Sequence, residues 1–275
     1  MSYSASRFRR SAEAFPFASG VLHSMLSGQM HVARKISKLT DGSAFASAAN
    51  AWHRWRHPID SEEILKSVDS AGLEQIREKY AVPGEKTHWP KYLDVRRFMP
   101  MNIRRAQALR LNLRREPLRI LDLGSGAGFF LLIARHLGHS GVGLDIADPP
   151  MYAEMFELLG FDRVVHEIKA YEALPDCGER FDLVTAFSIC FNGHKRAGLW
   201  TAKEWAFFLD DLSQRVLKPD GEVFLGMNPE YNGSFYTPRL RNYFIRRGAR
   251  IDRDKVWFRP LLPAINSAPA RLQSR

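Results

Sequence analysis

From residue 118 onward, short apolar runs alternate with segments whose apolar residues recur at helical spacing. Apolar runs bounded by turn residues are typical of buried strands, and a 3.6-residue period is typical of helices. The predicted strands are Leu118–Leu123, Gly141–Leu144, Arg163–Ile168, Phe181–Phe187 and Glu222–Met227, and a predicted helix at Phe129–Leu137 follows the first of them. Strands that alternate with helices favour an α/β fold with a doubly wound, Rossmann-like parallel sheet.

The first 117 residues lack this alternation. Residues 1–57 are interpreted as a basic appendage, with partial disorder an open alternative; apolar residues recur at helical spacing only over Val21–Leu39. Residues 58–117 are interpreted as a helical accessory or lid segment. We therefore predict a core domain at 118–262, followed by a C-terminal tail at 263–275.

Capping signals predict where three helices begin. Asp60 and Thr201 are each followed by a Glu three residues later, so the two side chains can satisfy each other's backbone donors. The helix that begins at Thr201 is expected to reach Val216. Asp148 precedes two prolines, which favours a third helix start. Gly72 could divide the Asp60 helix into two.

Composition narrows the class of protein. The chain has 275 residues, a formal net charge of +10 and 45% hydrophobic residues, which is ample for a packed core and excludes global disorder. No apolar run approaches the ~20 residues that cross a bilayer, so an integral membrane protein is not expected. Two cysteines, Cys177 and Cys190, cannot form a disulfide scaffold. We expect a cytoplasmic protein, with mitochondrial targeting a minor alternative because the N-terminus is rich in Arg and Ser.

Basic residues gather near the N-terminus and again between Arg239 and Arg259. Such groups can attract nucleic acid, anionic lipid or a phosphorylated substrate, so nucleic-acid binding and peripheral membrane contact stay open. No metal site is expected: His53 and His57 have a ligand-like spacing, but the arginines between them oppose a cation. The net charge leaves the function and the oligomeric state open.

A glycine-rich turn follows the first predicted strand, where ligands bind in open α/β sheets. Its glycines, at positions 124, 126 and 128, allow the backbone to approach a ligand closely. A dinucleotide fold would place a glycine at 129, where this chain has Phe129. The preceding Asp122 would repel a pyrophosphate but suits a ligand that carries an ammonium group. Asp145 ends the second strand, where a carboxylate can accept both hydroxyls of a ribose.

The segment Asp122–Gly128, with Asp145 one strand later, resembles the class I S-adenosylmethionine-dependent methyltransferases. Three further features agree in order: Glu172-Ala-Leu-Pro after the third strand, Phe181-Asp-Leu-Val in the fourth, and Leu217-Lys-Pro-Asp-Gly before the fifth. The resemblance covers residues 118–258. It implies an enzyme with a seven-stranded, mostly parallel sheet whose last strand is antiparallel, and S-adenosyl-L-methionine as its cofactor.

The same resemblance implies roles for individual residues. Those that would face the methionine part of the cofactor are Asp122, Gly124, Ser125, Gly126 and Gly128. Asp145 would bind the ribose, and Ile146 would pack on the adenine. Many family members place an Asp after the third strand to hold the adenine amino group, whereas this chain has Ala170 there. The backbone of Tyr171 or the side chain of Glu172 could substitute, with a solvated loop acid as the alternative for Glu172.

Methyl transfer requires an acceptor lone pair in line with the sulfonium methyl, and a hydroxyl acceptor also needs a base to take its proton. Just beyond the fourth strand, His194 and Asn192 are the candidate catalytic residues. A surface histidine and an Asn-Gly turn are the alternatives. The chain lacks the Asn/Asp-Pro-Pro-Tyr signature of many amino-group methyltransferases of nucleic acids and proteins, which favours O-methylation.

Aromatic and polar residues elsewhere are candidates for binding the substrate. After the fifth strand, Asn228, Tyr231 and Tyr236 could line an acceptor pocket, although turn formation would also explain this loop. Trp89 and Tyr92 could belong to a lid, although packing of the accessory helices is the simpler account.

We predict a methyltransferase that O-methylates a small-molecule, glycan or lipid-linked acceptor. The alternatives are an RNA methyltransferase that uses the basic surface and a non-catalytic, cofactor-binding scaffold that docks a partner through residues 1–57.

Overall fold

The computed structural model describes residues 43–81, 89–189, 199–230 and 233–262. The chain divides into two compact units, Met1–His53 and Arg54–Arg275. Within the first unit the structure describes only residues 43–53, which belong to helix α2 (Ser43–Arg56). In the described part of the chain, no helix is both long and apolar enough to cross a membrane.

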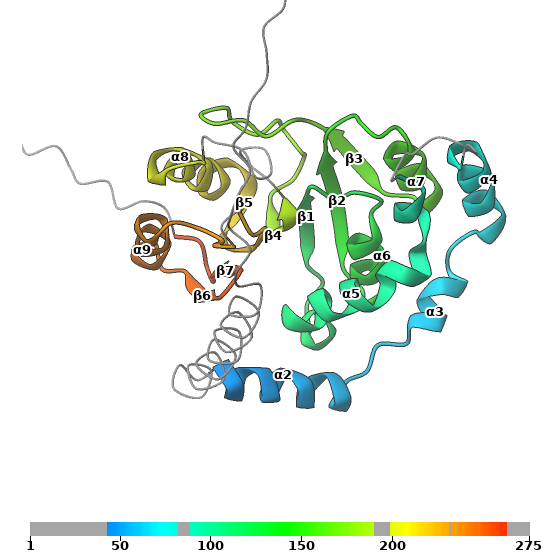
Figure 1. Ribbon diagram of the computed structural model, residues 1–275, viewed down its shortest axis with the longest axis horizontal. Helices are drawn as coiled ribbons and strands as arrows, with labels where there is room; N and C mark the ends of the chain where they lie inside the picture. Colours follow the sequence, from blue (N-terminus) through cyan, green and yellow to red (C-terminus); the bar gives the residue numbers. More distant parts are fainter. Residues whose placement is uncertain (1–42, 82–88, 190–198, 231–232, 263–275) are drawn as a thin grey trace, which may run out of the picture. The chain divides into compact units, whose positions relative to one another are not determined.

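The second unit is built on one seven-stranded sheet (Figure 1). Its strands are β1 (Arg119–Leu123), β2 (Ser140–Asp145), β3 (Asp162–Val165), β4 (Phe181–Ile189), β5 (Leu217–Met227), β6 (Arg250–Asp252) and β7 (Lys255–Phe258). Their order is β3-β2-β1-β4-β5-β7-β6, and β1 to β5 pair in parallel. The last strand, β7, is antiparallel to β5 and to β6. The predicted Rossmann-like sheet with an antiparallel last strand is confirmed.

The helices of this unit pack on both faces of the sheet. They are α3 (Ser61–Lys66), α4 (Ser70–Tyr80), η1 (Trp89–Leu93), α5 (Val95–Ala108), η2 (Leu111–Leu113), α6 (Phe129–His136), α7 (Met151–Leu159), α8 (Ala202–Asp211), η3 (Leu212–Val216) and α9 (Pro238–Arg246). Figure 1 shows α8 and α9 on one side of the sheet and α5, α6 and α7 on the other.

Successive side chains of each strand point to opposite faces of the sheet and pack into two apolar cores, one on each face. In β1, Ile120 packs with α3 to α7, whereas Leu121 packs with α8 and α9. In β4, Leu183 joins the first core and Val184 the second. Successive strand residues point to opposite faces, so a sheet that is covered on both faces needs apolar residues at both parities. These buried strands fix the edge at which their carboxyl ends meet.

The accessory helices follow their capping residues. Asp60 accepts hydrogen bonds from the backbone of Glu62 and Glu63, which confirms the predicted start of α3. A second cap at Asp69 begins α4, so the division into two helices lies before Gly72 and not at it. A Cβ on Gly72 would lie 2.5 Å from Leu158 Cδ1, so the glycine allows α4 to pack closely against α7.

Thr201 begins α8 with the predicted capping box, and the helix continues as the π-helix η3 to Val216. The prediction that Asp148 caps the next helix start is wrong. Pro150 occupies the N-cap position of α7 and makes no side-chain hydrogen bond there, so Asp148 lies two residues before the cap. An N-cap side chain must reach the second or third helical N–H, which Asp148 is too early in the chain to do.

Most strand boundaries lie within two residues of the prediction, and the end of β3 and the start of β5 differ by more. β3 ends at Val165 and not at Ile168, because Val165 already pairs with Asp145, the last residue of β2. Beyond that pair the neighbouring strand has ended. β5 begins at Leu217, opposite Phe181, so the Leu217-Lys-Pro-Asp-Gly segment that was expected before the strand belongs to it. The pairing with β4 is irregular between Leu217 and Glu222.

Candidate functional site

The candidate site lies at the carboxyl ends of β1, β2 and β4. Register places Asp122 of β1 directly beside Thr185 of β4. Thr185 Oγ1 donates a hydrogen bond to Asp122 Oδ1 at 2.6 Å. Both residues are buried, Asp122 with 3% of its surface exposed and Thr185 with none. Asp122 lies two positions after Ile120 in β1, so its side chain points to the same face of the sheet, which α5 and α6 cover.

Burial has the largest effect on the pKa of the Asp122 carboxyl. It raises the pKa of the Asp122 carboxyl to about 7 because a carboxylate loses its hydration there. The hydrogen bond from Thr185 and the positive charge of Arg105 act in the opposite direction, and the charge of Asp145 adds a smaller increase. Near neutral pH the group is therefore poised between its two forms, and a cationic ligand beside it would favour the ionised one.

The glycine turn connects β1 to α6. Gly124, Gly126 and Gly128 have φ of 66°, 56° and 77°, a region that side chains other than glycine rarely adopt. A Cβ on Gly126 would meet only the ring end of Tyr152, at 3.8 Å, so this part of the turn is open on its ligand side. A Cβ on Gly128 would lie 3.1 Å from Phe156. Gly128 is buried and packs against α7.

Ser125, in the same turn, is also buried. Among the described residues its hydroxyl has no hydrogen-bond partner. A buried hydroxyl without a partner carries a free-energy cost, which a polar ligand group could offset.

Asp145, at the end of β2, is half-buried beside the turn. Its Oδ2 accepts a hydrogen bond from the Gly126 amide at 2.7 Å, and its Oδ1 accepts one from the Ile146 amide at 2.8 Å. Each carboxylate oxygen can accept a further hydrogen bond. Ile146 follows with 46% of its surface exposed and offers an apolar surface next to the carboxylate.

The loop after β3 contains the residues predicted to lie at the adenine. Ala170, Tyr171 and Glu172 are all exposed. Tyr171 has a φ of 60°, and its hydroxyl donates to Glu204 Oε1 of α8 at 2.7 Å. Glu172 Oε1 lies 4.0 Å from His166 Nε2 within the same loop.

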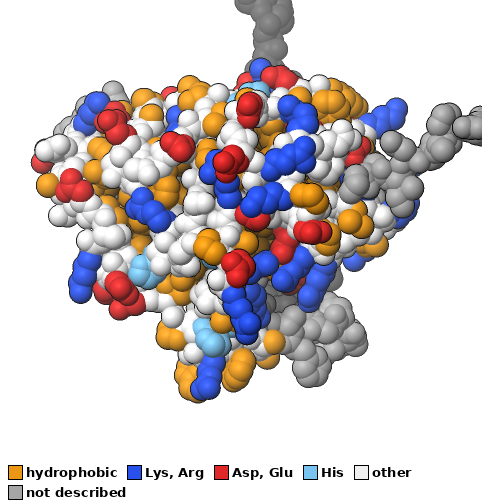
Figure 2. All heavy atoms as spheres, turned by 180° about the vertical axis from the view of Figure 1, so that it is seen from behind, with side chains coloured by type: hydrophobic (Ala, Val, Ile, Leu, Met, Phe, Trp, Pro, Cys, Tyr) orange, Lys and Arg blue, Asp and Glu red, His pale blue; other side chains and the backbone are white. Residues whose placement is uncertain are grey.

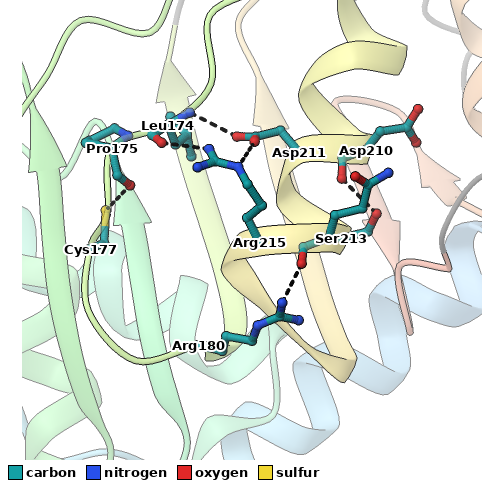
Figure 3. Close-up of polar contacts among 9 residues, drawn as sticks. Leu174, Pro175, Cys177, Arg180, Asp210, Asp211, Ser213 and Arg215 are labelled. Carbon is teal, nitrogen blue, oxygen red and sulfur yellow. Dashed lines mark hydrogen bonds and ion pairs between the residues drawn. The ribbon is translucent and has the colours of Figure 1, made fainter.

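An acid and a base of α8 and η3 hold this loop (Figure 3). Asp211 Oδ2 accepts a hydrogen bond from the Leu174 amide at 2.9 Å, and Arg215 Nη2 donates to the Leu174 carbonyl at 2.7 Å. Arg215 Nε also donates to Asp211 Oδ1 at 2.5 Å. We call Asp211, Arg215 and Leu174 the loop clasp. It satisfies both backbone groups of one loop residue and fixes the loop to the helix.

A cavity of about 330 Å³ opens beside the glycine turn. The turn residues Gly124–Ala127 and Asp122 form one side of it, and Tyr152 of α7 also lines it. Aromatic side chains dominate the rest: Tyr92, Phe98, Phe129, Phe130 and Phe187. Such a mixture of apolar walls and a few polar groups is typical of small-molecule sites.

The α5 side of the cavity carries a cation. Arg105 Nη1 donates to Asn102 Oδ1 at 2.9 Å, and the guanidinium carbon lies 4.5 Å from the ring centroid of Phe187. Burial lowers the pKa of Arg105, and the nearby Asp122 raises it. An arginine side chain keeps its charge even so.

The predicted acceptor residues fall in different places. His194, Asn192 and Tyr231 lie outside the described residues, as does the side chain of Trp89. Tyr92 lines the cavity.

The two described candidates after β5, Asn228 and Tyr236, lie in different surroundings. Asn228 Nδ2 donates to the Ser188 carbonyl at 2.6 Å, and Ser188, with a φ of 60°, lines the cavity. Tyr236 does not line it. The Tyr236 ring lies 6.3 Å from that of Phe244, and its hydroxyl donates to the Arg253 carbonyl.

Several cavity residues were not predicted from the sequence: Phe98, Met101, Asn102, Arg105, Tyr152 and Phe187. One signal was present. Phe98, Met101 and Arg105 are spaced three, then four residues apart, so they form a single stripe of α5. Phe98 and Met101 are half-buried, so a charged residue that continues their stripe marks a candidate ligand group.

Some of the arginines between Arg239 and Arg259 form ion pairs with acidic side chains. Arg247 Nη1 lies 2.8 Å from Asp210 Oδ1, and Arg259 Nε lies 3.3 Å from Glu222 Oε1. On the face in Figure 2, Lys and Arg side chains are interspersed with Asp and Glu. Charge on that face is therefore mixed.

No family model and no curated protein matches the sequence. Among solved structures, an amino pentose methyltransferase from Micromonospora echinaspora, with S-adenosylmethionine bound, is 26% identical; the match covers 52% of this chain and 58% of that one, with a TM-score of 0.36. The Burkholderia thailandensis 1,6-didemethyltoxoflavin-N1-methyltransferase, with S-adenosylhomocysteine bound, is 16% identical over 69% and 87%, with a TM-score of 0.42.

The ribosomal protein L11 methylase of Lactobacillus delbrueckii is 18% identical over 60% of this chain and 76% of that one, with a TM-score of 0.37. At TM-scores below 0.5, none of these similarities establishes a shared activity.

Proposed function

We propose that the chain is an S-adenosylmethionine-dependent methyltransferase that O-methylates a small-molecule, glycan or lipid-linked acceptor. The observation that carries the proposal is the placement of two carboxylates around one glycine turn. Asp122 lines the same cavity as the turn, and Asp145 accepts a hydrogen bond from the Gly126 amide. They lie at the carboxyl ends of two adjacent parallel strands: Asp145 is the last residue of β2, and Asp122 is the last but one of β1. An ammonium group beside Asp122 and a ribose beside Asp145 would place a single nucleoside across the turn.

The residues present fit this cofactor. Gly126 leaves the turn open to a ligand, and the unpartnered hydroxyl of Ser125 offers a buried polar group nearby. Ile146 offers an exposed apolar surface on which an adenine could stack. The loop with Ala170, Tyr171 and Glu172 would complete the adenine side, held in place by the loop clasp.

When bound, the cofactor supplies a methyl group that its sulfonium already activates. The chain must then align the acceptor and exclude water, and the aromatic walls of the cavity suit both tasks. A volume of about 330 Å³ is at the low end for ligand sites, which favours a small acceptor group. We propose His194 as the base that takes the hydroxyl proton and Asn192 as its polar neighbour, since both follow β4 in the sequence.

The position after β4 also favours a hydroxyl acceptor. Residues 188–191, at the end of β4 and just after it, read Ser-Ile-Cys-Phe, whereas many amino-group methyltransferases of nucleic acids and proteins carry an Asn/Asp-Pro-Pro-Tyr signature there. Methylation of RNA and a non-catalytic scaffold role stay as alternatives, and a cytoplasmic location stays the expectation.

Calorimetric titration with S-adenosylhomocysteine tests the cofactor. We expect the wild-type chain to bind it, and Asp145→Ala to weaken binding at least tenfold, because a charged hydrogen-bond acceptor contributes about 1.5–3 kcal/mol. Asp162→Ala, which changes an exposed acid at the start of β3, should leave the affinity unchanged. Tight binding of a nicotinamide dinucleotide without any binding of S-adenosylhomocysteine would refute the proposal.

Turnover separates the enzyme from a scaffold. Cell extract incubated with the chain and methyl-labelled cofactor should yield labelled small molecules. Label that appears only in RNA would favour the RNA alternative, and bound cofactor without any turnover would favour the scaffold.

A further inference from the structure

Arg105 is a cation on the wall of the cavity that the glycine turn borders. Its described contacts are neutral: the side-chain amide of Asn102 and the ring of Phe187. Among the described residues no carboxylate lies within the 4.0 Å that defines an ion pair with it. A partly buried guanidinium with only neutral contacts leaves donors for an anionic ligand, and its planar fork matches a carboxylate.

The opposite charge lines the same cavity. Asp122 is close enough for the charge of Arg105 to lower the pKa of its carboxyl. Its Oδ1 accepts the hydrogen bond from Thr185, and Asp122 is one of the residues that line the cavity. An acid from β1 and a base from α5 therefore bracket one space, beside a turn that is open to a ligand at Gly126. Paired opposite charges of this kind complement a zwitterion.

We propose that Arg105 binds the carboxylate of the cofactor's amino-acid end, opposite Asp122, to which the proposed function already assigns the ammonium group. This inference rests on the proposed function and deepens it. It makes α5, and with it the helical segment before the core domain, part of the cofactor site. Arg105 then acts as a binding residue for the methionine part, whereas Asp145 serves the sugar.

Two ligands that differ by the amino-acid part test the inference by calorimetry. S-adenosylhomocysteine carries both charges, and 5′-methylthioadenosine carries neither. We expect Arg105→Met to weaken S-adenosylhomocysteine binding by about 10- to 100-fold, the effect of one charged hydrogen-bonded contact. The affinity for 5′-methylthioadenosine should stay within about twofold, because that ligand has no carboxylate to lose.

Matched variants control the result. Arg104→Met removes an exposed arginine that neighbours Arg105 on the same helix and does not line the cavity, and it should leave both affinities unchanged. Arg105→Lys keeps the charge without the fork and should recover part of the lost affinity for S-adenosylhomocysteine.

Deleting the group from the ligand tests the same contact without a variant. Decarboxylated S-adenosylmethionine should bind the wild-type chain more weakly than S-adenosylmethionine by the factor that Arg105→Met causes. The Arg105→Met variant should then bind S-adenosylmethionine and its decarboxylated form with nearly equal affinity. If Arg105→Met does not fold, the wild-type comparison decides alone, and equal affinities overturn the inference.

The outcomes separate the inference from the proposed function. Failure of the wild-type chain to bind either nucleoside refutes both. Equal losses for S-adenosylhomocysteine and 5′-methylthioadenosine refute the inference alone, and so does an unchanged affinity for both. Unchanged cofactor binding with a raised KM for a carboxylated acceptor would assign Arg105 to the acceptor and also overturn it.

Discussion

Two carboxylates at the ends of neighbouring strands differ in what surrounds them. Asp122 is enclosed between the sheet and α5, where it accepts a hydroxyl hydrogen bond from Thr185. Asp145 is half-buried and accepts two backbone amides, from Gly126 and Ile146. A hydroxyl donor stabilises a buried carboxylate less than several amides or a full positive charge would. The two acids are therefore suited to different parts of one ligand.

The environment of Asp122 predicts a pH dependence of cofactor binding. With its pKa raised to about 7, the free carboxyl is mainly protonated at pH 6 and mainly ionised at pH 8. The ligand ammonium group favours the ionised form, so affinity should rise with pH and binding should release a proton. We expect about a tenfold gain in S-adenosylhomocysteine affinity from pH 6 to pH 8.

Calorimetry in buffers of different ionisation enthalpy measures the proton directly. Asp122→Asn cannot ionise, so its affinity should be lower at pH 8 and nearly independent of pH over this range. A wild-type affinity that falls with rising pH, or proton uptake on binding, would contradict the assignment of the ammonium group to Asp122.

At the scale of elements, the loop after β3 depends on the helix that packs beside it. The loop clasp joins Leu174 to Asp211 and Arg215, and Tyr171 adds a hydrogen bond to Glu204. Asp211 is buried, with 6% of its side chain exposed, whereas the Arg215 side chain is 49% exposed. The acid therefore depends on the loop amide and on Arg215 for its hydrogen bonds.

Removing Arg215 should loosen the loop and lower the stability of the fold. Arg215→Met leaves the Leu174 carbonyl and one Asp211 oxygen without this donor, which should lower the free energy of unfolding by about 1–3 kcal/mol. Chemical denaturation measures the loss, and hydrogen exchange should show a faster-exchanging Leu174 amide.

Arg246→Met is the matched control, because it changes an exposed arginine in the last turn of α9. It should lie within about 0.5 kcal/mol of the wild type. If both variants unfold at the same denaturant concentration, the clasp does not hold the loop.

The sequence predicted helix starts correctly where a start depends only on the neighbouring residues. Asp60 and Thr201 begin helices as their capping patterns indicate, because a cap involves only the next few residues. The end of β3 depends instead on where β2 stops, which no local pattern in residues 163–168 records. The predicted start of α7 was wrong because Asp148 lies two residues before Pro150, which occupies the N-cap position without a side-chain hydrogen bond.

For the whole molecule, the proposed site joins parts that are distant in the chain. It draws on α5, the turn after β1, the end of β2 and the loop after β3. A ligand that binds only the folded arrangement of these parts must stabilise it by mass action.

We therefore expect S-adenosylhomocysteine to raise the melting temperature. At a free concentration of 100 times its Kd the stabilisation is about 2.7 kcal/mol, which corresponds to a rise of roughly 5–10 °C for a domain of this size. Thermal unfolding followed by circular dichroism measures it. Asp145→Ala at the same ligand concentration should show a smaller rise, and an equal rise with a nicotinamide dinucleotide would contradict the specificity of the turn.

Only the part of the candidate site whose residues lie close together in the sequence could be predicted. The turn with Gly124, Gly126 and Gly128 and the flanking acids are close in sequence, and register then brings Asp122 and Asp145 to one edge. Arg105 and Tyr152 reach the cavity from helices whose packing depends on the whole fold, so the sequence alone did not identify them. His194 and Asn192 stay predictions, because they lie outside the described residues.

The hydrogen bond between Asp145 and the Gly126 amide has a consequence for how such a site can evolve. The carboxylate assigned to the sugar also shapes the turn that meets the rest of the ligand. Any replacement at this position would alter both at once. A descendant of this chain that came to prefer a 2′-deoxynucleoside would have to acquire that preference through other residues and keep this acid.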